Sequence, residues 1–128
     1  MLVVYGDTPL LEGETLERLA HRRESTGAAA VVLAADAPDP TGYGRVLRRW
    51  DGTFDRIVEH RDADEAALAI TEVNSGMYDV DAEFLAGALP ALGTANDQGE
   101  YYLPDVCNHR PDDVVIEPMP FEEMSGIN

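Results

Sequence analysis

Polar side chains stand where apolar stretches of this sequence stop, and their types suit the binding of a cation or a polar ligand. Asp7 follows Gly6 directly after the apolar residues 2–5, and ligands bind just beyond such strand ends in open α/β sheets. Its carboxylate could hold a divalent cation there, or it could accept backbone hydrogen bonds within a turn. Glu59 follows the apolar pair 57–58 and could accept hydrogen bonds from a sugar hydroxyl or an amide, or face solvent as a strand end.

Two further segments combine glycine with polar residues. Asn74, Ser75 and Gly76 interrupt an otherwise strand-like stretch. Because asparagine and glycine are poor strand formers, they predict either a bulge or a close contact with a ligand. Residues 41–45, Thr-Gly-Tyr-Gly-Arg, hold two glycines that would let the backbone approach a ligand, although the pattern also fits an irregular start of a hairpin. The segment lacks the spacing of a phosphate-binding Walker loop.

The remaining polar residues carry less information. The tyrosine pair 101–102, between a glycine and a proline, could line a pocket or form a packed corner. Asn128 is the last residue and, taken alone, is expected to be inert. His60 stands alone and is not expected to bind a metal, while His21 and His109 are expected on the surface. No Ser-His-Asp order, Cys-His pair or Gly-x-Ser-x-Gly segment is present, so the residues alone indicate an α/β domain with a metal and sugar-phosphate site.

Charge and composition exclude several classes of function. The 128 residues carry 25 acidic and nine basic side chains, all nine of them arginine, for a formal charge of −16. This acidity argues against non-specific nucleic-acid binding and against binding to anionic membranes. A phosphorylated ligand would need a metal ion or a local arginine cluster beside it. The single cysteine, Cys107, excludes an internal disulfide and a cysteine-based zinc cluster. With no secretory signal and no run near the ~20 apolar residues of a membrane span, we expect a cytoplasmic protein.

Hydrophobic periodicity predicts alternating strands and helices. The first 34 residues predict a βαβ unit whose opening strand is buried on both faces of a parallel sheet, and Asp51-Gly52 predicts a hairpin with a two-residue turn. The strands are expected at residues 2–5, 28–34, 45–50, 54–59, 72–80 and 113–117. The helices are expected at residues 14–24, 62–70 and 81–89, with a short one from Pro104 and an irregular tail at 118–128. This alternation favours one α/β domain with a mixed sheet.

Six segments, taken in order along the chain, resemble one family of enzymes. They are residues 5–10 (Tyr-Gly-Asp-Thr-Pro-Leu), 39–45 (Asp-Pro-Thr-Gly-Tyr-Gly-Arg), 57–60 (Ile-Val-Glu-His), 72–76 (Glu-Val-Asn-Ser-Gly), 96–103 (Asn-Asp-Gln-Gly-Glu-Tyr-Tyr-Leu) and 126–128 (Gly-Ile-Asn). Together they resemble the uridyltransferase domain of bacterial N-acetylglucosamine-1-phosphate uridyltransferases, also called UDP-N-acetylglucosamine pyrophosphorylases. The second and fifth segments are the most specific.

The resemblance implies a Rossmann-like (GT-A-like) nucleotidyltransferase fold with a mixed sheet. It also implies transfer of UMP from UTP to N-acetylglucosamine 1-phosphate, which forms UDP-N-acetylglucosamine and releases pyrophosphate. By motif, Asp7 and Asn128 would be the protein ligands of a Mg²⁺ cofactor. Tyr5 and Gly6 would lie beside the nucleotide and the sugar.

The same resemblance assigns a sugar site. Gly44, Glu59 and Asn74 would contact the N-acetylglucosamine part through a backbone amide and side chains. No residue is expected to serve as a general base, because the attacking phosphate oxygen is already ionised.

The family's Gly-rich nucleotide-binding loop lies upstream of the Gly-Asp strand, and its acetyltransferase half is a β-helix of hexapeptide repeats. We therefore expect residues 1–128 to form a partial nucleotidyltransferase domain, incomplete at the N-terminal side and without the β-helix. It would supply the sugar and Mg²⁺ side, be inactive alone, and pair with the missing N-terminal nucleotide-binding half. The alternatives are another sugar-phosphate nucleotidyltransferase or a noncatalytic module that binds nucleotide sugars.

Overall fold

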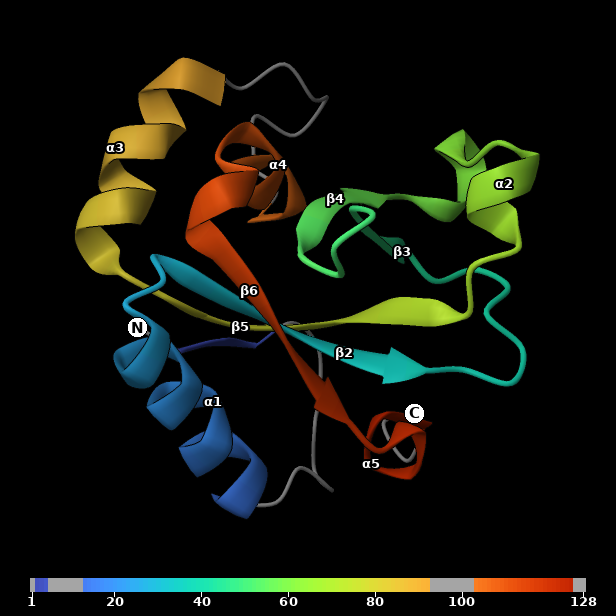
Figure 1. Cartoon of the computed structure of the whole chain (residues 1–128), viewed down its shortest axis with the longest axis horizontal. Helices are drawn as coiled ribbons and strands as arrows, with labels where there is room; N and C mark the ends of the chain where they lie inside the picture. Colours follow the sequence, from blue (N-terminus) through green and yellow to red (C-terminus); the bar gives the residue numbers. More distant parts are fainter. Residues whose placement is uncertain (1, 5–12, 93–102, 126–128) are drawn as a thin grey trace.

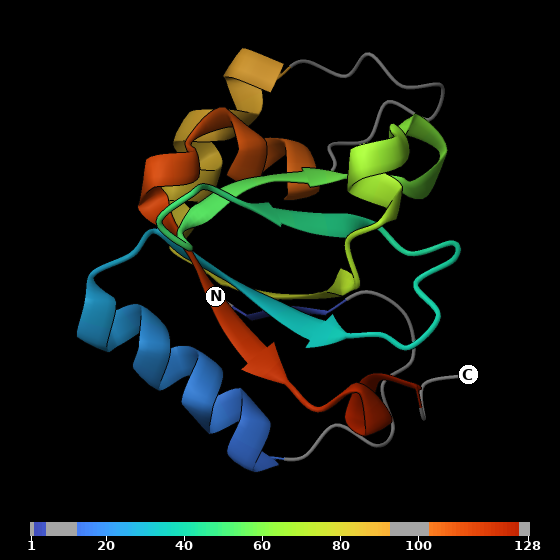
Figure 2. The same ribbon diagram turned by 45° about the vertical axis from the view of Figure 1, so that its right-hand side comes forward.

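The computed structural model describes residues 2–4, 13–92 and 103–125, which form a mixed six-stranded sheet with helices on both faces (Figures 1 and 2). The strands are β1 (Leu2–Val4), β2 (Ala30–Asp36), β3 (Arg45–Arg48), β4 (Phe54–Val58), β5 (Glu72–Val80) and β6 (Val114–Met119). The helices are α1 (Gly13–Thr26), α2 (Glu65–Leu68), α3 (Ala82–Leu92), α4 (Leu103–His109) and α5 (Phe121–Ser125), with 3₁₀ turns η1 (His60–Asp62) and η2 (Pro111–Asp113). The predicted α/β class with a mixed sheet is confirmed, and it is consistent with a partial Rossmann-like nucleotidyltransferase fold.

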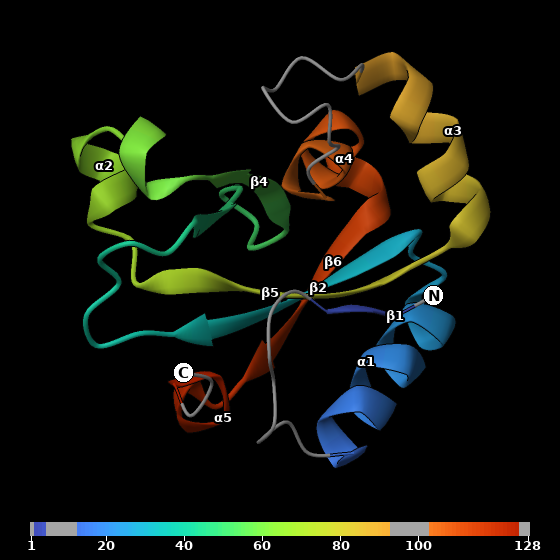
Figure 3. The same cartoon turned by 180° about the vertical axis from the view of Figure 1, so that it is seen from behind.

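Strand β5 lies at the centre of the strand pairing. Tyr78 pairs with Val32 of β2 and with Val3 of β1, so these two strands lie on opposite edges of β5. Further back along β5, Val73 pairs with β3 on the edge that β1 occupies. Figure 3 shows β1 beside β5 at the end nearer α3. Both β1 and β2 run antiparallel to β5, so the opening strand is not paired within a parallel sheet as expected, and β5 separates it from β2.

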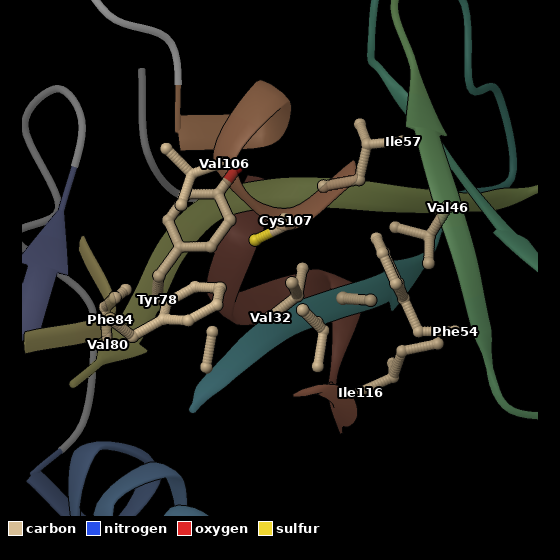
Figure 4. Packing of buried hydrophobic residues seen from close by; sticks show 13 residues of the cluster. Val32, Val46, Phe54, Ile57, Tyr78, Val80, Phe84, Val106, Cys107 and Ile116 are labelled. Carbon is tan, nitrogen blue, oxygen red and sulfur yellow. The ribbon is translucent and has the colours of Figure 1, made fainter. Parts of the chain in front are cut away.

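Strand β2 is buried on both of its faces, which explains its unbroken apolar sequence. Ala30, Val32 and Ala34 join the cluster that α3 and α4 cover, which Figure 4 shows from close by. The intervening residues of β2 join a second cluster under α1 and α5. Strand β2 also makes the sheet's parallel pair, with β6. The two clusters fix which helices lie on each face.

Some predicted boundaries are wrong, and local hydrogen bonds explain why. The helix expected at 62–70 is a 3₁₀ turn followed by the short α2, because the Asp64 carboxylate accepts a hydrogen bond from Ala67 N at 2.9 Å and caps a new helix there. The tail expected to be irregular continues β6 to Met119 and forms α5, since Met119 and Met124 are buried in the second cluster.

The hairpin between β3 and β4 has a three-residue turn instead of the predicted two-residue one. Arg49 N donates to Thr53 O at 2.8 Å, and Gly52 N donates to Arg49 O at 2.9 Å. Gly52 has a φ of +87°, which glycine adopts without strain and which completes this class of turn. The Asp51 carboxylate accepts a hydrogen bond from Thr53 N at 3.0 Å.

Helix α4 caps the outer edge of β4 through one side chain. The Asn108 amide oxygen accepts a hydrogen bond from Ile57 N at 2.7 Å, and its nitrogen donates to Ile57 O at 2.9 Å. The amide thus satisfies both backbone groups of a residue on an edge strand, as a neighbouring strand would. This contact fixes the end of β4, directly before Glu59.

Within the described parts of the chain, no helix combines the length and apolar character needed to cross a membrane.

The fold predicts that Cys107 is chemically inert. Its thiol is buried in the cluster that α3 and α4 cover (Figure 4), and burial raises its pKa to about 12. Because the thiolate is the reactive form, we expect the native protein to resist a thiol reagent such as DTNB at neutral pH. The contribution of this buried proton to stability is complete below pH 9.0 and is lost as the pH rises toward 12.

The measurement is the rate of thiol labelling in buffer and in denaturant. One equivalent should react per chain in denaturant, because the sequence holds a single cysteine. Rapid stoichiometric labelling of the folded chain would show that the thiol is accessible.

Candidate functional site

Three of the residues predicted from the sequence come together at one end of the β3–β4 hairpin. Gly44 directly precedes β3, Glu59 directly follows β4, and Asn74 lies on β5. Asn74 N donates a hydrogen bond to Gly44 O at 2.9 Å. A Cβ atom placed on Gly44 would lie 3.3 Å from Glu59 Oε2 and 3.5 Å from Oε1. Residues from three separate segments therefore form one cluster, which we call the 44–59–74 cluster.

The carboxylate of Glu59 is available for a ligand. Its residue is exposed, and it stands at the N-cap of η1 without capping that turn through its side chain. Among the residues that the structure describes, none donates a hydrogen bond to this carboxylate. A carboxylate is an acceptor only, so Glu59 presents a charged acceptor next to the backbone of Gly44.

Asn74 lies in the predicted bulge. Val32 pairs with Tyr78 and Ala34 pairs with Asn74, so four steps along β5 correspond to two along β2. The extra residues are accommodated at Gly76, whose φ is +85°, a conformation that favours glycine. The bulge reading of this segment is confirmed, while contact with a ligand stays a prediction.

Side chains within the bulge replace the hydrogen bonds that the ladder loses there. Gly76 N donates to Asn74 Oδ1 at 3.0 Å, and Met77 N donates to Ser75 Oγ at 3.1 Å. Asn74 Nδ2 donates to the hydroxyl of the buried Tyr78 at 2.7 Å. An amide side chain offers two donors and two acceptor lone pairs, so the described residues leave Asn74 one donor and one acceptor for a ligand.

The loop before Gly44 is held by its own polar groups and by one ring. The Asp39 carboxylate accepts hydrogen bonds from Thr41 Oγ1 at 2.7 Å and from Thr41 N at 3.2 Å, and these bonds lower the pKa of Asp39. Tyr43 N donates to Pro40 O at 3.1 Å, and the Tyr43 ring meets Phe121 of α5 edge-on, with 6.4 Å between centroids. The segment 41–45 is therefore an ordered start of the hairpin, and its approach to a ligand stays a prediction.

Arg45 lies in the candidate segment 41–45, but the sequence assigned no role to its side chain, which lies beside the cluster. The residue is 2% exposed, and its guanidinium donates to carbonyl oxygens of the loop before it and of the chain ahead of β5. Arg45 Nη1 also lies 3.2 Å from His60 Nδ1. Arginine has no acceptor, so this ring nitrogen must accept the hydrogen bond. The one sequence signal for this role was the position of Arg45 directly after a glycine- and proline-rich loop, because the carbonyl oxygens of such a loop need hydrogen-bond donors.

Other predicted site residues lie outside the described residues. These are Tyr5, Gly6, Asp7 and Asn128, as well as the tyrosine pair 101–102. The proposed Mg²⁺ ligands, Asp7 and Asn128, therefore stay a prediction. Within residues 13–92 and 103–125, no group of three or more His, Cys, Asp or Glu side chains is placed to hold a metal ion.

Comparison with known proteins supports the resemblance drawn from the motifs. No family model matches the chain. The chain is 50% identical, over 99% of its length, to the "Bifunctional protein GlmU" of Exiguobacterium sp. strain AT1b. It is 53% identical over 82% of its length to the protein of that name from Shouchella clausii, and 50% identical over 82% to that of Bacillus mycoides.

The chain spans 29% of the length of the Exiguobacterium protein and 23% of the other two. The predicted family resemblance is confirmed for the segment that aligns.

The cluster predicts that Gly44→Ala displaces Glu59 without unfolding the protein. The new methyl group would lie 3.3 Å from Glu59 Oε2 and 3.5 Å from Ile57 Cγ2. The end of a flexible side chain can move by this amount, so we expect stability to change by less than ~1 kcal/mol. The side-chain carboxyl ¹³C resonance of Glu59 should shift, and urea unfolding should measure the stability.

Gly87→Ala is the matched control. Nothing lies within 4 Å of a Cβ built at this position of α3, so the variant should gain up to ~1 kcal/mol of stability and leave the Glu59 resonance in place. A Glu59 resonance that Gly44→Ala does not move would contradict the close contact.

Proposed function

We propose that this chain, homologous over 99% of its length to a segment of proteins named GlmU, forms the N-acetylglucosamine-binding part of a uridyltransferase. The complete reaction would transfer UMP from UTP to N-acetylglucosamine 1-phosphate and release pyrophosphate. The observation that carries the proposal is the 44–59–74 cluster. It combines a carboxylate without a described protein partner, an amide with spare hydrogen-bonding groups and a glycine backbone.

The hydrogen-bonding groups of this cluster suit an acetamido sugar. Glu59 can accept from sugar hydroxyls, and bonds to a charged acceptor are stronger than those between neutral groups. Asn74 retains one donor and one acceptor, which match the carbonyl and hydroxyl groups of such a ligand. Gly44 has no side chain, so the Glu59 carboxylate can lie close against its backbone. The donors and acceptors thus come from β5 and from the ends of the β3–β4 hairpin, which favours recognition of one orientation.

The reaction needs no general base. An ionised phosphate oxygen of the sugar phosphate would form a bond to the α-phosphorus of UTP, while the bond to pyrophosphate breaks. The main obstacle is the approach of two anions, which positioning and a divalent cation can overcome. The carboxylate of Asp7 and the amide oxygen of Asn128 are hard oxygen ligands of the kind that Mg²⁺ prefers. A bound Mg²⁺ would neutralise phosphate charge.

The proposal predicts that N-acetylglucosamine 1-phosphate binds at Glu59. Isothermal titration calorimetry of the 128-residue chain with this ligand should show saturable binding in the presence of Mg²⁺. Glu59→Gln keeps the side-chain shape but removes the charged acceptor, so affinity should fall about tenfold or more.

Glu65→Gln is the matched control for charge and residue type. Glu65 is exposed in the first turn of α2, and this variant should bind the sugar phosphate like the parent. Equal affinities for the parent and both variants would remove Glu59 from the site. No binding by any of the three would reject the sugar-site proposal.

The chain tested alone is expected to give no turnover. The 128 residues carry a formal charge of −16 and no lysine, so UTP meets a repulsive field over a Debye length of about 8 Å at physiological salt. They also span only 29% of the Exiguobacterium relative. A coupled assay for pyrophosphate, with UTP, sugar phosphate and Mg²⁺, should stay at background. Steady formation of UDP-N-acetylglucosamine by this polypeptide would overturn the expectation.

A further inference from the structure

We propose that Arg45 is a positioning residue for the sugar site, an inference that rests on the proposed function. Its buried guanidinium would set the relative positions of Gly44, Glu59 and Asn74 while making no contact with the ligand itself.

The first support is the burial of the cation. Arg45 is the largest of the side chains that are almost completely excluded from solvent. A buried charge is costly unless its hydrogen bonds are satisfied. Here Nε donates to Ile70 O at 3.0 Å, and Nη1 donates to Pro40 O at 2.8 Å and to Tyr43 O at 2.5 Å. The guanidinium therefore bonds tightly to the backbone around it.

The second support is where these acceptors lie in the chain. Pro40 and Tyr43 belong to the loop that ends at Gly44. His60, whose Nδ1 lies 3.2 Å from Nη1, directly follows Glu59. One planar group thus links the segments that carry two of the three cluster residues.

The third segment is tied in through the chain ahead of β5. Arg45 Nε donates to Ile70 O at 3.0 Å, and Nη2 donates to Leu68 O at 3.4 Å. This chain continues into β5, where Asn74 N donates to Gly44 O at 2.9 Å. Each of the three cluster residues therefore lies within a few residues, along the chain, of a group that the Arg45 guanidinium contacts.

Lysine could not make this set of contacts. Arginine donates from three nitrogens spread over a rigid plane, whereas lysine donates from a single point. Arg45→Lys would keep the positive charge but release some of the three segments. Since the acceptors are mostly backbone carbonyls, the loss should appear as altered geometry of the cluster.

The test compares Arg45→Lys with Arg48→Lys in the 128-residue chain. Arg48 lies on the same strand and makes a two-pronged contact with Glu72, from Nε to Oε1 at 2.7 Å and from Nη2 to Oε2 at 2.8 Å. Arg48→Lys also removes a pair of guanidinium hydrogen bonds, but Arg48 makes these bonds to Glu72, which is not a residue of the cluster. The two variants therefore separate a general loss of stability from a loss of positioning.

Two readouts are measured under conditions where both variants are folded. The first is hydrogen exchange of the Asn74 amide relative to the Val32 amide in the core strand β2. The second is the affinity for N-acetylglucosamine 1-phosphate by calorimetry. For Arg45→Lys we expect Asn74 protection to fall about tenfold more than Val32 protection, and affinity to fall about tenfold. Arg48→Lys should leave the Asn74-to-Val32 ratio and the affinity unchanged.

The outcomes separate this inference from the proposed function. Exchange at Asn74 that follows Val32 in Arg45→Lys, or equal affinity of that variant and the parent, would overturn the positioning role. Absence of sugar-phosphate binding by the parent would reject the proposed function, and the exchange ratio would then decide by itself whether Arg45 holds the cluster.

Discussion

The arrangement of the site depends on one constraint, which is that strand β5 must form hydrogen-bonded pairs with three other strands. β5 pairs with β2 along one edge, and on the other edge it pairs first with β3 and then with β1. The ladder with β2 shifts register between the two halves of β5. Backbone groups that lose partners at such a shift must find others, and Asn74 and Ser75 supply them. The same irregularity places the amide of Asn74 next to the end of the β3–β4 hairpin.

The hairpin end beside this bulge is held from several directions. Asn108 fixes the last part of β4 from the side of α4, Tyr43 packs on Phe121 of α5, and Arg45 joins the intervening loops. The contacts of Asn108 and Phe121 come from helices on opposite faces of the sheet. The site at this end of the hairpin therefore gains rigidity from both layers of the fold, as precise recognition requires.

The sequence could predict features that local physics controls. Asparagine and glycine within a strand indicated a bulge or a ligand contact at 74–76, and the apolar run at 28–34 indicated a strand. It could not predict the burial and hydrogen bonds of the Arg45 guanidinium, because its acceptors lie in segments 2 to 25 residues away. It also missed the end of β6 and α5. Met119 and Met124 are buried against β2 and α1, and a pattern read within the tail does not contain those partners.

The family resemblance added what local patterns lacked, and the structure tests part of it. From local patterns alone, Gly44, Glu59 and Asn74 each had both a functional and a purely structural interpretation. The family motifs assigned all three to one sugar site. The structure places the three together. Their proximity is independent of the motifs, because it follows from strand pairing and side-chain contacts. It favours the sugar-site proposal.

The distribution of arginine bears on how a phosphorylated ligand could be held. Six of the nine arginines lie at hydrogen-bond or ion-pair distance from protein groups. They are Arg22 with Glu117, Arg23 with Asp79, Arg45 with backbone carbonyls, Arg48 with Glu72, Arg49 with Asp112 and Arg110 with Asp113. The described residues give Arg18, Arg56 and Arg61 no such partner, and of these Arg56 and Arg61 lie within three residues of Glu59 in sequence.

Two exposed arginines are a weak counter-charge for a phosphate that must approach a carboxylate in a chain of charge −16. A divalent cation supplies two charges at one point and can bind phosphate and carboxylate oxygens together. The scarcity of uncommitted arginine therefore favours a metal-assisted site. A shared ligand would link the two proposed sites. The sugar phosphate whose sugar binds at Glu59 would have its phosphate group bound to the Mg²⁺ that Asp7 and Asn128 are proposed to hold.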